Sequence, residues 1–341
     1  MSKAAELAKW GEVSTNGQVS GRRNIVYNGA MQVAQRGTSF DYVTTDAYCL
    51  DRFNIDVTGG DNSAGRLTAS QAAITDLPGF ANALKFDCTT ADTSIAAGEA
   101  LILSQRFEGQ DVQQLKKGTS SAEKFTVSFY VKGTAKTYAL EVLDIDTTNN
   151  RSIAQTFGVT TSWNRVVLTF DGDTTGVLDD DANRAVGIGS FYSSTDNEFF
   201  ITGLQMEVGS QATPFEHRSF GEELQLCRRY LQYFDAHSNY DRFAIGTATT
   251  TDDCNFLFKF NPYMRDVPTL VHGTLSEIVV LDNDNSAEAI GSLSIDTNTD
   301  GPQGCNVEAS DITSDVMTAG DATQISANNT ANAFISFDSE L

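Results

Sequence analysis

Alternating apolar and polar residues mark the central part of the chain as a series of β-strands. In the clearest run, FTVSFYV, every second residue from Phe125 to Val131 is apolar, so one face of the strand is apolar and the other polar. Similar runs occupy residues 83–87, 101–107, 137–143, 165–170, 186–191 and 198–208. Segments rich in Gly, Asn, Asp, Ser and Thr separate them. Many short strands with turns between them predict an all-β sandwich, of jelly-roll type, over residues 22–218.

The periodicity changes after residue 218, where a helix is predicted over residues 219–234. Ser219 followed by Glu222 is a capping box, the S-x-x-E pattern that starts a helix. Four apolar residues then follow at spacings of three, four and three, as in a coiled-coil seam: Leu224, Cys227, Leu231 and Phe234. Two interpretations stay open. The seam holds three chains together in a short helical bundle, or the helix packs against its own sandwich.

The two ends of the chain differ from this central part. Residues 235–341 return to strand-like runs, which predict a second β domain: 241–249, 254–260, 269–275, 277–282, 291–296 and 332–338. Residues 1–21 start with a short stretch of helix formers, in which Leu7 and Trp10 need a partner to be buried. We interpret residues 1–21 as a helical segment that anchors the protein to a larger particle. A frayed tail, or a helix packed on its own domain, is the alternative.

The charge balance excludes two classes of partner. The chain has 45 acidic and 23 basic residues, a net charge of −22. Residues 235–341 hold 17 of the acidic and 3 of the basic residues, a net charge of −14. Such a surface repels nucleic acids and anionic membranes, and no apolar run approaches the roughly 18 residues of a membrane span. We therefore expect no nucleic-acid partner and no membrane insertion. The charge itself suits solubility at high salt or an ordinary acidic surface.

Neither the cysteines nor the histidines indicate a transition-metal site. The five cysteines are scattered, odd in number and without C-x-x-C spacing. We predict free thiols in a protein made in a reducing cytoplasm. No zinc site is predicted, because the three histidines do not cluster with the cysteines. The run Asp179, Asp180 and Asp181 suits a structural calcium ion or a solvated acidic turn. No other cofactor is expected.

No catalytic signature stands out, so no enzyme activity is expected. A glycan hydrolase needs two positioned carboxylates, and 45 acidic residues offer too many pairs for any one to be informative. There is no nucleophile elbow and no triad order. Sugar binding would instead use exposed rings. Three tyrosines in loop-like contexts are candidates for receptor contacts, although each also suits ordinary packing: Tyr192, Tyr240 and Tyr263.

Two segments that bracket the predicted sandwich resemble a protein family. Residues 24–37 read N-x-x-x-N-G-x-M-x-x-x-Q-R-G. Residues 203–218 read G-x-Q-x-E-x-G-x-x-A-T-P-F-E-x-R, and E-E-x-x-x-C-x-R-Y follows at 222–230. This pairing resembles the fibre and appendage proteins of tailed bacteriophages, particularly marine ones, over residues 24–234. The strand order also resembles that of jelly-roll carbohydrate-binding modules, in which Trp163 matches the position of a tryptophan.

The resemblance implies a virion protein, made in the cytoplasm of a bacterial host, that attaches to the host surface. It implies a homotrimer, with residues 1–21 facing the particle and the acidic residues 235–341 forming the tip that binds a host glycan or protein receptor. Three copies would turn weak individual contacts into firm attachment. The alternative is a structural role without receptor binding, as a capsid decoration or a tail adaptor that contacts other virion proteins.

Overall fold

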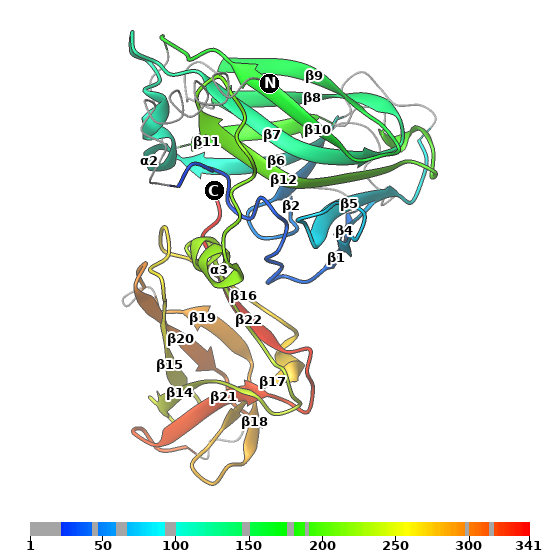
Figure 1. Cartoon of the computed structure of the whole chain (residues 1–341). Coiled ribbons are helices and arrows are strands. Elements are labelled where there is room, and N and C mark those ends of the chain that lie inside the picture. The colour runs from blue at the N-terminus through cyan, green and yellow to red at the C-terminus, as the bar shows by residue number, and fades with distance from the viewer. Residues whose placement is uncertain are drawn as a thin grey trace. The chain divides into compact units, whose positions relative to one another are not determined.

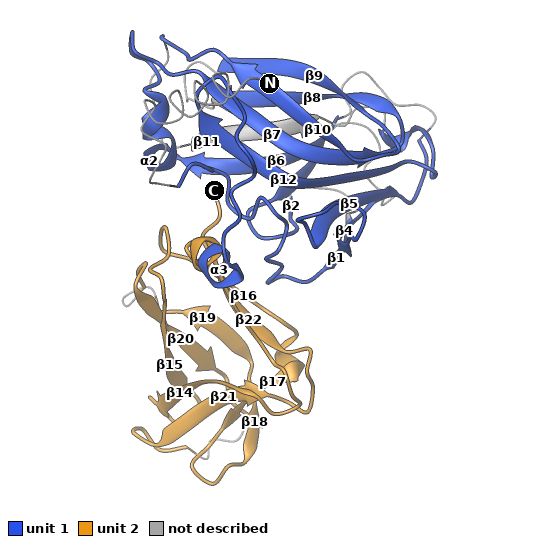
Figure 2. Ribbon diagram, viewed as in Figure 1, with its two compact units in different colours: residues 1–223, 341 blue, residues 224–340 orange. Residues whose placement is uncertain are grey.

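The computed structural model describes residues 22–42, 47–58, 67–92, 100–144, 151–175, 181–187, 191–296, 300–313 and 317–341. The chain divides into two compact units (Figures 1 and 2): unit 1 ends at Glu223 and includes Leu341, and unit 2 covers residues 224–340. Both units are built mainly from antiparallel β-strands, as the sequence predicts. Among the described residues, no helix is both long enough and apolar enough to cross a membrane.

Unit 1 is a sandwich of two six-stranded sheets (Figure 1). The first sheet has the order β1 (Ser39–Tyr42), β4 (Leu67–Ala73), β5 (Asn82–Cys88), β12 (Glu198–Val208), β7 (Phe125–Gly133) and β10 (Asn164–Phe170). The second has the order β2 (Ala47–Tyr48), β3 (Asn54–Thr58), β6 (Ala100–Glu108), β11 (Asp181–Gly187), β8 (Lys136–Asp144) and β9 (Arg151–Val159). The helical turns are α2 (Gly109–Val112), η2 (Gln113–Leu115) and η3 (Phe191–Ser193). The chain crosses repeatedly between the sheets from β5 onwards, as the strands of a jelly roll do.

Apolar alternation explains which residues fill the core of unit 1. In β7 the predicted apolar positions are buried, with Phe129 and Val131 at 0 % exposure. Strand β12 has the predicted bounds, and its Phe199 and Met206 are also at 0 % exposure. These side chains form one hydrophobic cluster with residues of the second sheet, such as Leu103. The two sheets are therefore held face to face by a continuous apolar layer.

Two predictions for unit 1 are wrong in detail. The strand predicted over residues 186–191 is β11, which ends at Gly187, and Phe191 starts the turn η3 instead. Tyr192 follows in that turn and is only 4 % exposed, because it packs with Phe191 in the core (5.9 Å between ring centroids). Its ring is therefore buried, whereas the prediction of a receptor contact needs an exposed ring.

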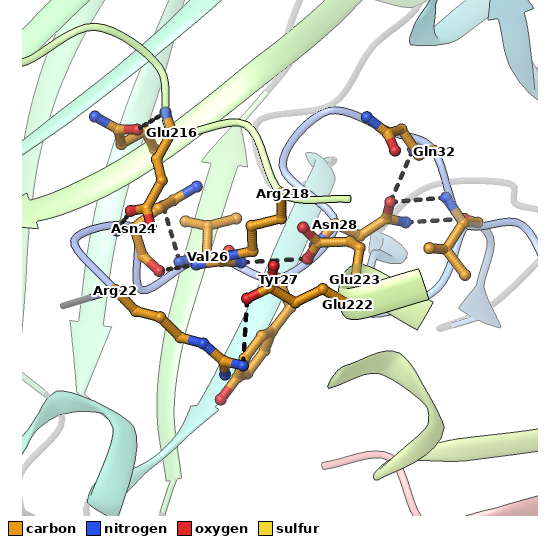
Figure 3. Close-up of polar contacts among 12 residues, drawn as sticks. Arg22, Asn24, Val26, Tyr27, Asn28, Gln32, Glu216, Arg218, Glu222 and Glu223 are labelled. Carbon is orange, nitrogen blue, oxygen red and sulfur yellow. Dashed lines mark hydrogen bonds and ion pairs between the residues drawn. The ribbon is translucent and has the colours of Figure 1, made fainter. Parts of the chain in front are cut away.

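Residues 22–38, which we call the opening segment of unit 1, precede β1, form no regular strand and are held by side chains. The Asn24 side chain accepts hydrogen bonds from the backbone N–H groups of Val26 (3.0 Å) and Met206 (3.0 Å). We call residues 209–218, which follow β12, the closing segment. The carboxylate of Glu216 in this segment accepts the N–H groups of Arg23 (2.8 Å) and Asn24 (2.7 Å). Figure 3 shows Asn24 and Glu216 facing one another. In a regular strand these backbone N–H groups would pair with a neighbouring strand. Here the side chains of Asn24 and Glu216 accept them instead.

A second set of contacts joins the opening segment to the residues that lead into the next helix (Figure 3). The Arg218 guanidinium donates to the backbone oxygens of Val26 (3.0 Å) and Asn24, and lies 3.3 Å from the Glu223 carboxylate. Glu223 also accepts the backbone N–H of Asn28 (2.5 Å). The side chains of Arg218 and Glu223 are only 3 % and 9 % exposed. The two segments that carry the family resemblance therefore meet around a buried ion pair.

Asn28 and Gly29 shape the turn at the centre of the opening segment. The Asn28 side-chain oxygen accepts the N–H groups of Gln32 and Val33, both at 2.9 Å, and its backbone is left-handed, with φ of 54°. Asparagine tolerates this conformation better than most residues. At Gly29 a Cβ atom would lie 2.1 Å from the backbone oxygen of Leu204. Only glycine lets the opening segment approach β12 so closely.

The helix that follows, α3 (Phe220–Arg228), starts where predicted and ends early. Ser219 Oγ accepts the N–H of Glu222 (3.3 Å), as the capping box predicts. The chain then leaves the helix, and Leu231 and Phe234 lie in strand β13 (Leu231–Asp235). Five register pairs join β13 to β22, near the other end of the sequence. This long-range pairing outweighs the local helical pattern.

The predicted apolar seam is therefore wrong, because its residues do not share one helix. They are divided between α3 and β13: Leu224, Cys227, Leu231 and Phe234. Cys227 and Leu231 are each 1 % exposed, and Phe234 packs against Phe258 of unit 2 (5.4 Å between centroids). Without the seam, a homotrimer stays an expectation of the family resemblance alone.

Unit 2 combines a three-stranded and a seven-stranded sheet around its own core (Figure 1). The smaller sheet has the order β13, β22 (Phe334–Asp338) and β16 (Thr269–His272). The larger has the order β18 (Ala287–Ala289), β17 (Ile278–Leu281), β21 (Ala322–Ala327), β14 (Arg242–Ala248), β15 (Cys254–Lys259), β20 (Gly304–Ser310) and β19 (Ser292–Ile295), with the turn η4 (Leu275–Glu277) before β17. Each strand-like run predicted for residues 235–341 contains a strand, whereas β18, β20 and β21 were not predicted.

The cysteines give a direct test of this packing. All five are buried, and among the described residues they form no disulfide bond. Burial raises the pKa of the Cys49 and Cys305 thiols to about 12, so almost no reactive thiolate forms at neutral pH. We expect no reaction with a thiol reagent such as DTNB in the native protein and reaction of all five thiols after unfolding. Rapid labelling of any cysteine in the native state would contradict the packing described here.

Candidate functional site

The outward face of the first sheet of unit 1 is shaped by an irregularity in its central strand, β12. The pairing of β12 with β7 shifts register between Thr202 and Gln205. Gly203 lies inside this bulge with φ of +63°, and a Cβ atom there would come within 2.8 Å of the Phe80 ring. Glycine is required for both reasons. The bulge therefore lets Phe80, from the connection between β4 and β5, lie over the sheet.

The closing segment covers one end of this outward face. Thr126 of β7 donates to the backbone oxygen of Gly209 (2.8 Å). The Glu207 carboxylate accepts both the hydroxyl (2.7 Å) and the N–H (2.8 Å) of Thr213, and Gln205 donates to the same hydroxyl (3.1 Å). Gln205 and Glu207 are at 0 % exposure. These polar residues of the motif are thus bonded structural groups beneath the closing segment, as buried polar groups must be.

Beyond the closing segment, aromatic and cationic side chains alternate across the sheet. Phe200 of β12 is in register with Lys85 of β5 on one side and with Lys132 of β7 on the other. The Lys132 ammonium lies 4.8 Å from the centroid of the Phe200 ring and 5.2 Å from that of Trp163, which precedes β10. Lys85 lies 5.3 Å from Phe200 on its other side. At such distances a cation is attracted to the ring face.

The next row of the same face is also aromatic. The Phe80 ring lies 5.3 Å from Tyr130, 5.1 Å from Phe215 and 5.2 Å from His217, measured between centroids. Phe215 and His217 belong to the closing segment, so the resembling motif supplies part of the surface. His217 is exposed and the other rings are half-buried. We call this surface the aromatic face and define it by six rings: Phe80, Tyr130, Trp163, Phe200, Phe215 and His217.

Asp76 ties Trp163 and Lys132 together. It lies in the same connection as Phe80 and accepts hydrogen bonds from the Trp163 indole N–H (2.9 Å) and from the Lys132 ammonium (2.6 Å). These two bonds, that from Lys132 first, hold the pKa of the Asp76 carboxyl below its usual value. Each Asp76 oxygen thus has one partner: Trp163 for one oxygen and Lys132 for the other. The carboxylate of Asp76 and the edge-on contact with Phe200 together orient the half-buried indole.

The lowered pKa of Asp76 predicts how Trp163 responds to acid. A depressed carboxyl pKa means that both bonds persist throughout the range above the usual value of 3.8 and are lost only as the pH falls through the lower, folded-state value. In a Trp10→Phe background, the emission of Trp163 should therefore stay constant from about pH 8 to about pH 4. Asp76→Ala should show the altered emission already at neutral pH. A transition centred between about pH 5 and pH 7, with the far-UV spectrum unchanged, would contradict this assignment.

The receptor candidates predicted from the sequence differ in their exposure. Tyr192 is buried in unit 1. Tyr240 and Tyr263 are each 60 % exposed, in separate loops of unit 2. The Tyr240 hydroxyl donates to the Asn329 side chain (2.9 Å). Their exposure fits the prediction, and a role in receptor binding stays a prediction.

The anchor and calcium predictions fall largely outside the described residues. Leu7, Trp10, Asp179 and Asp180 lie there, and of Asp181 only the backbone, at the start of β11, is described. Within the part of the chain that the structure describes, no group of three or more His, Cys, Asp or Glu side chains is arranged to hold a metal ion.

Sequence reasoning missed most of the aromatic face. Trp163 stands out in the sequence only through its position in the resemblance. Phe80, Lys132 and Phe200 were not among the predicted site residues. A signal was present: Phe200 occupies an outward position of a predicted strand and Lys132 directly follows another, and large side chains at such positions face solvent unless they serve a contact. Pairing of β5, β12 and β7 was needed to bring them into one row.

No protein-family model matches the sequence, and no curated protein matches it. Several solved structures are similar to part of the chain. The enzymatically active domain of tailspike protein 4 of bacteriophage CBA120 shows 15 % identity over 55 % of this chain and 21 % of that one, with a TM-score of 0.36. The family 11 carbohydrate-binding module of the cellulase Lic26A-Cel5E of Clostridium thermocellum shows 12 % identity over 50 % and 99 %, with a TM-score of 0.30. The CBM22-1 xylan-binding domain of Paenibacillus barcinonensis Xyn10C shows 12 % identity over 51 % and 94 %, with a TM-score of 0.28. The match thus spans about a fifth of the tailspike domain and nearly the full length of both modules.

Proposed function

We propose that this protein is an appendage of a tailed-phage virion that attaches to glycans on the host cell surface through the aromatic face of unit 1. The observation that carries the proposal is the row formed by Lys85, Phe200, Lys132 and Trp163. Three of these side chains come from paired strands and Trp163 from the loop before β10, and together they combine ring surfaces with hydrogen-bonding groups.

A pyranose ring presents two kinds of surface, apolar C–H groups and hydroxyls, and the aromatic face matches both. Half-buried rings offer apolar area at low cost in conformational entropy. The ammonium groups of Lys85 and Lys132 and the carboxylate of Asp76 lie beside those rings, where they can bond hydroxyls. The strands hold the groups in place, so little ordering is needed on binding.

Attachment without catalysis fits this face better than hydrolysis does. A glycosidase uses one carboxyl as an acid and a second as a base or nucleophile. Asp76 is instead engaged with Lys132 and Trp163, and its pKa is lowered, the opposite of what a general acid needs.

The virion location rests on the resembling motifs. They hold the opening and closing segments of unit 1 together through Asn24, Glu216 and Arg218, and they supply Gly203 and Phe215 to the aromatic face. A motif with this combined role suits a family of attachment domains. The segment with Leu7 and Trp10 would then anchor the protein to the particle.

Two measurements test the proposal together. Purified protein on a glycan microarray should bind a discrete set of glycans. An antibody against unit 1 should label the tail or another appendage of intact virions and reduce infection. Label distributed over the head, or no binding to any glycan or to host cells, would show that the proposal is wrong.

One observation favours a second candidate, a structural protein of the capsid or tail. Ile245 and Leu257 lie on the adjacent strands β14 and β15 of unit 2 and are 73 % and 54 % exposed. Neighbouring exposed aliphatic side chains are typical of protein contacts. If this candidate is right, the wild type should bind no glycan. Ile245→Asp should then lower the incorporation of the protein into virions.

A further inference from the structure

We propose that Asp76 makes the aromatic face selective for neutral glycans, because it positions Trp163 and at the same time neutralises Lys132. The inference rests on the proposed function and specifies the class of glycan. Asp76 is a positioning residue that acts through Trp163 and Lys132.

The first step of the argument is the double use of the Asp76 carboxylate. Oδ1 accepts the Trp163 indole N–H at 2.9 Å and Oδ2 accepts the Lys132 ammonium at 2.6 Å. The Lys132 side chain is only 20 % exposed and lies between the rings of Trp163 and Phe200. Its charge is thus satisfied by one carboxylate and two ring faces before any ligand arrives.

The second step is the charge balance of the whole face. Lys85 is paired in the same way, with Asp87 (2.8 Å) and Glu198 (3.7 Å). The cations of the face are Lys85, Lys132 and Arg165, and its carboxylates are Asp76, Asp87 and Glu198. Among the exposed and half-buried side chains of the face, these three positive and three negative charges leave no net charge, with His217 counted as neutral. Glu207 is buried beneath the closing segment and is not counted. The face is a neutral surface on a chain of net charge −22.

The consequence for ligands follows from electrostatics. An acidic glycan would be repelled at long range by the chain, and it could reach Lys85 or Lys132 at short range only by displacing a carboxylate. Arg165, which donates to Ser128 Oγ (3.2 Å) and to the Thr213 backbone oxygen, has no carboxylate partner among the described residues and is the one cation left for such a ligand. A neutral glycan needs no displacement, because its hydroxyls can join the existing ion pairs as further donors and acceptors.

Two substitutions of Asp76 separate its two roles. Asp76→Asn keeps an oxygen that can accept the Trp163 indole N–H and removes the charge opposite Lys132. Asp76→Ala removes both. The test measures binding of the full-length wild type and both variants to microarrayed neutral and acidic glycans, at low and high NaCl, with Trp163 emission recorded in a Trp10→Phe background.

We expect the wild type to bind neutral glycans with an affinity that changes less than about twofold with salt, since no counterions are released. Asp76→Asn should bind neutral glycans more tightly than Asp76→Ala does, because it keeps an acceptor for the Trp163 indole, and it should gain salt-sensitive binding of acidic glycans. Asp76→Ala should weaken neutral binding at least about fivefold and shift the Trp163 emission.

The outcomes distinguish this inference from the proposed function. Wild-type binding of acidic glycans that falls steeply with salt would overturn the selectivity and leave glycan attachment standing. Neutral binding by the wild type with no gain for acidic glycans in Asp76→Asn would overturn the role of Asp76. Failure of all three proteins to bind any glycan would overturn the proposed function itself.

Discussion

Replacing Arg218 with leucine is expected to destabilise unit 1 by about 3–5 kcal/mol, the usual cost of breaking a buried ion pair on one side. The substitution removes the cation beside the Glu223 carboxylate, which is only 9 % exposed. Of the bonds described above, that carboxylate then keeps only the one from the N–H of Asn28. It also removes the donor to the backbone oxygens of Val26 and Asn24. Arg218 is the residue that joins the opening segment to Glu223, so its replacement breaks both sets of contacts at once.

Urea unfolding followed by Trp163 emission measures this effect, because unit 2 contains no tryptophan. The Trp10→Phe background makes Trp163 the sole reporter. Arg22→Ala is the matched control: Arg22 pairs with Glu222 at 3.5 Å in the same region, but the two side chains are 55 % and 43 % exposed. We expect the control to lose less than about 1 kcal/mol. Equal losses for the two variants would mean that the buried pair does not hold the segments together.

Replacing Trp163 with alanine is expected to lower the affinity for the bound glycan at least about tenfold, or about 1.4 kcal/mol. The indole is the largest ring of the aromatic face and is held in place by Asp76. Its removal also takes one of the two rings from the Lys132 ammonium. The thermal stability of unit 1 should change little, since the indole is half-buried on the outward face and not in the core.

Two tyrosines of unit 2 provide the matched controls for this experiment. Tyr240 and Tyr263 are each 60 % exposed, and both were receptor candidates from the sequence. Tyr240→Ala and Tyr263→Ala should bind glycan like the wild type if the aromatic face is the site. Normal binding by Trp163→Ala together with a loss in either tyrosine variant would move the receptor site to the C-terminal unit.

The fold was predictable where the pattern is strong and the contacts are local. Strand β12 has the predicted bounds, and the capping box at Ser219 marks the start of α3 correctly. Strand β4, with the sequence LTASQAA, and strand β9, with RSIAQTFGV, were missed because their small and polar residues give weak alternation. Their pairing partners β5 and β8, not their own composition, hold them in the sheets.

The larger errors came from contacts between distant parts of the sequence. Leu231 and Phe234 continue the helical spacing of α3, yet pairing with β22 places them in strand β13. Tyr192 lies in a loop-like sequence, yet the turn η3 directs its ring into the core. The aromatic face could not be predicted for the same reason: its rings come from five separate regions, and only the sheet register and the bulge at Gly203 bring them together.

The most direct test of the central claim is adsorption of phage to host cells when purified protein is added as a competitor. Wild-type protein should block adsorption in a dose-dependent way, Tyr240→Ala should block it equally well, and Trp163→Ala should not block it at matched concentrations. If Trp163→Ala blocks adsorption as strongly as the wild type, or if the wild type does not block it at all, attachment through the aromatic face is contradicted.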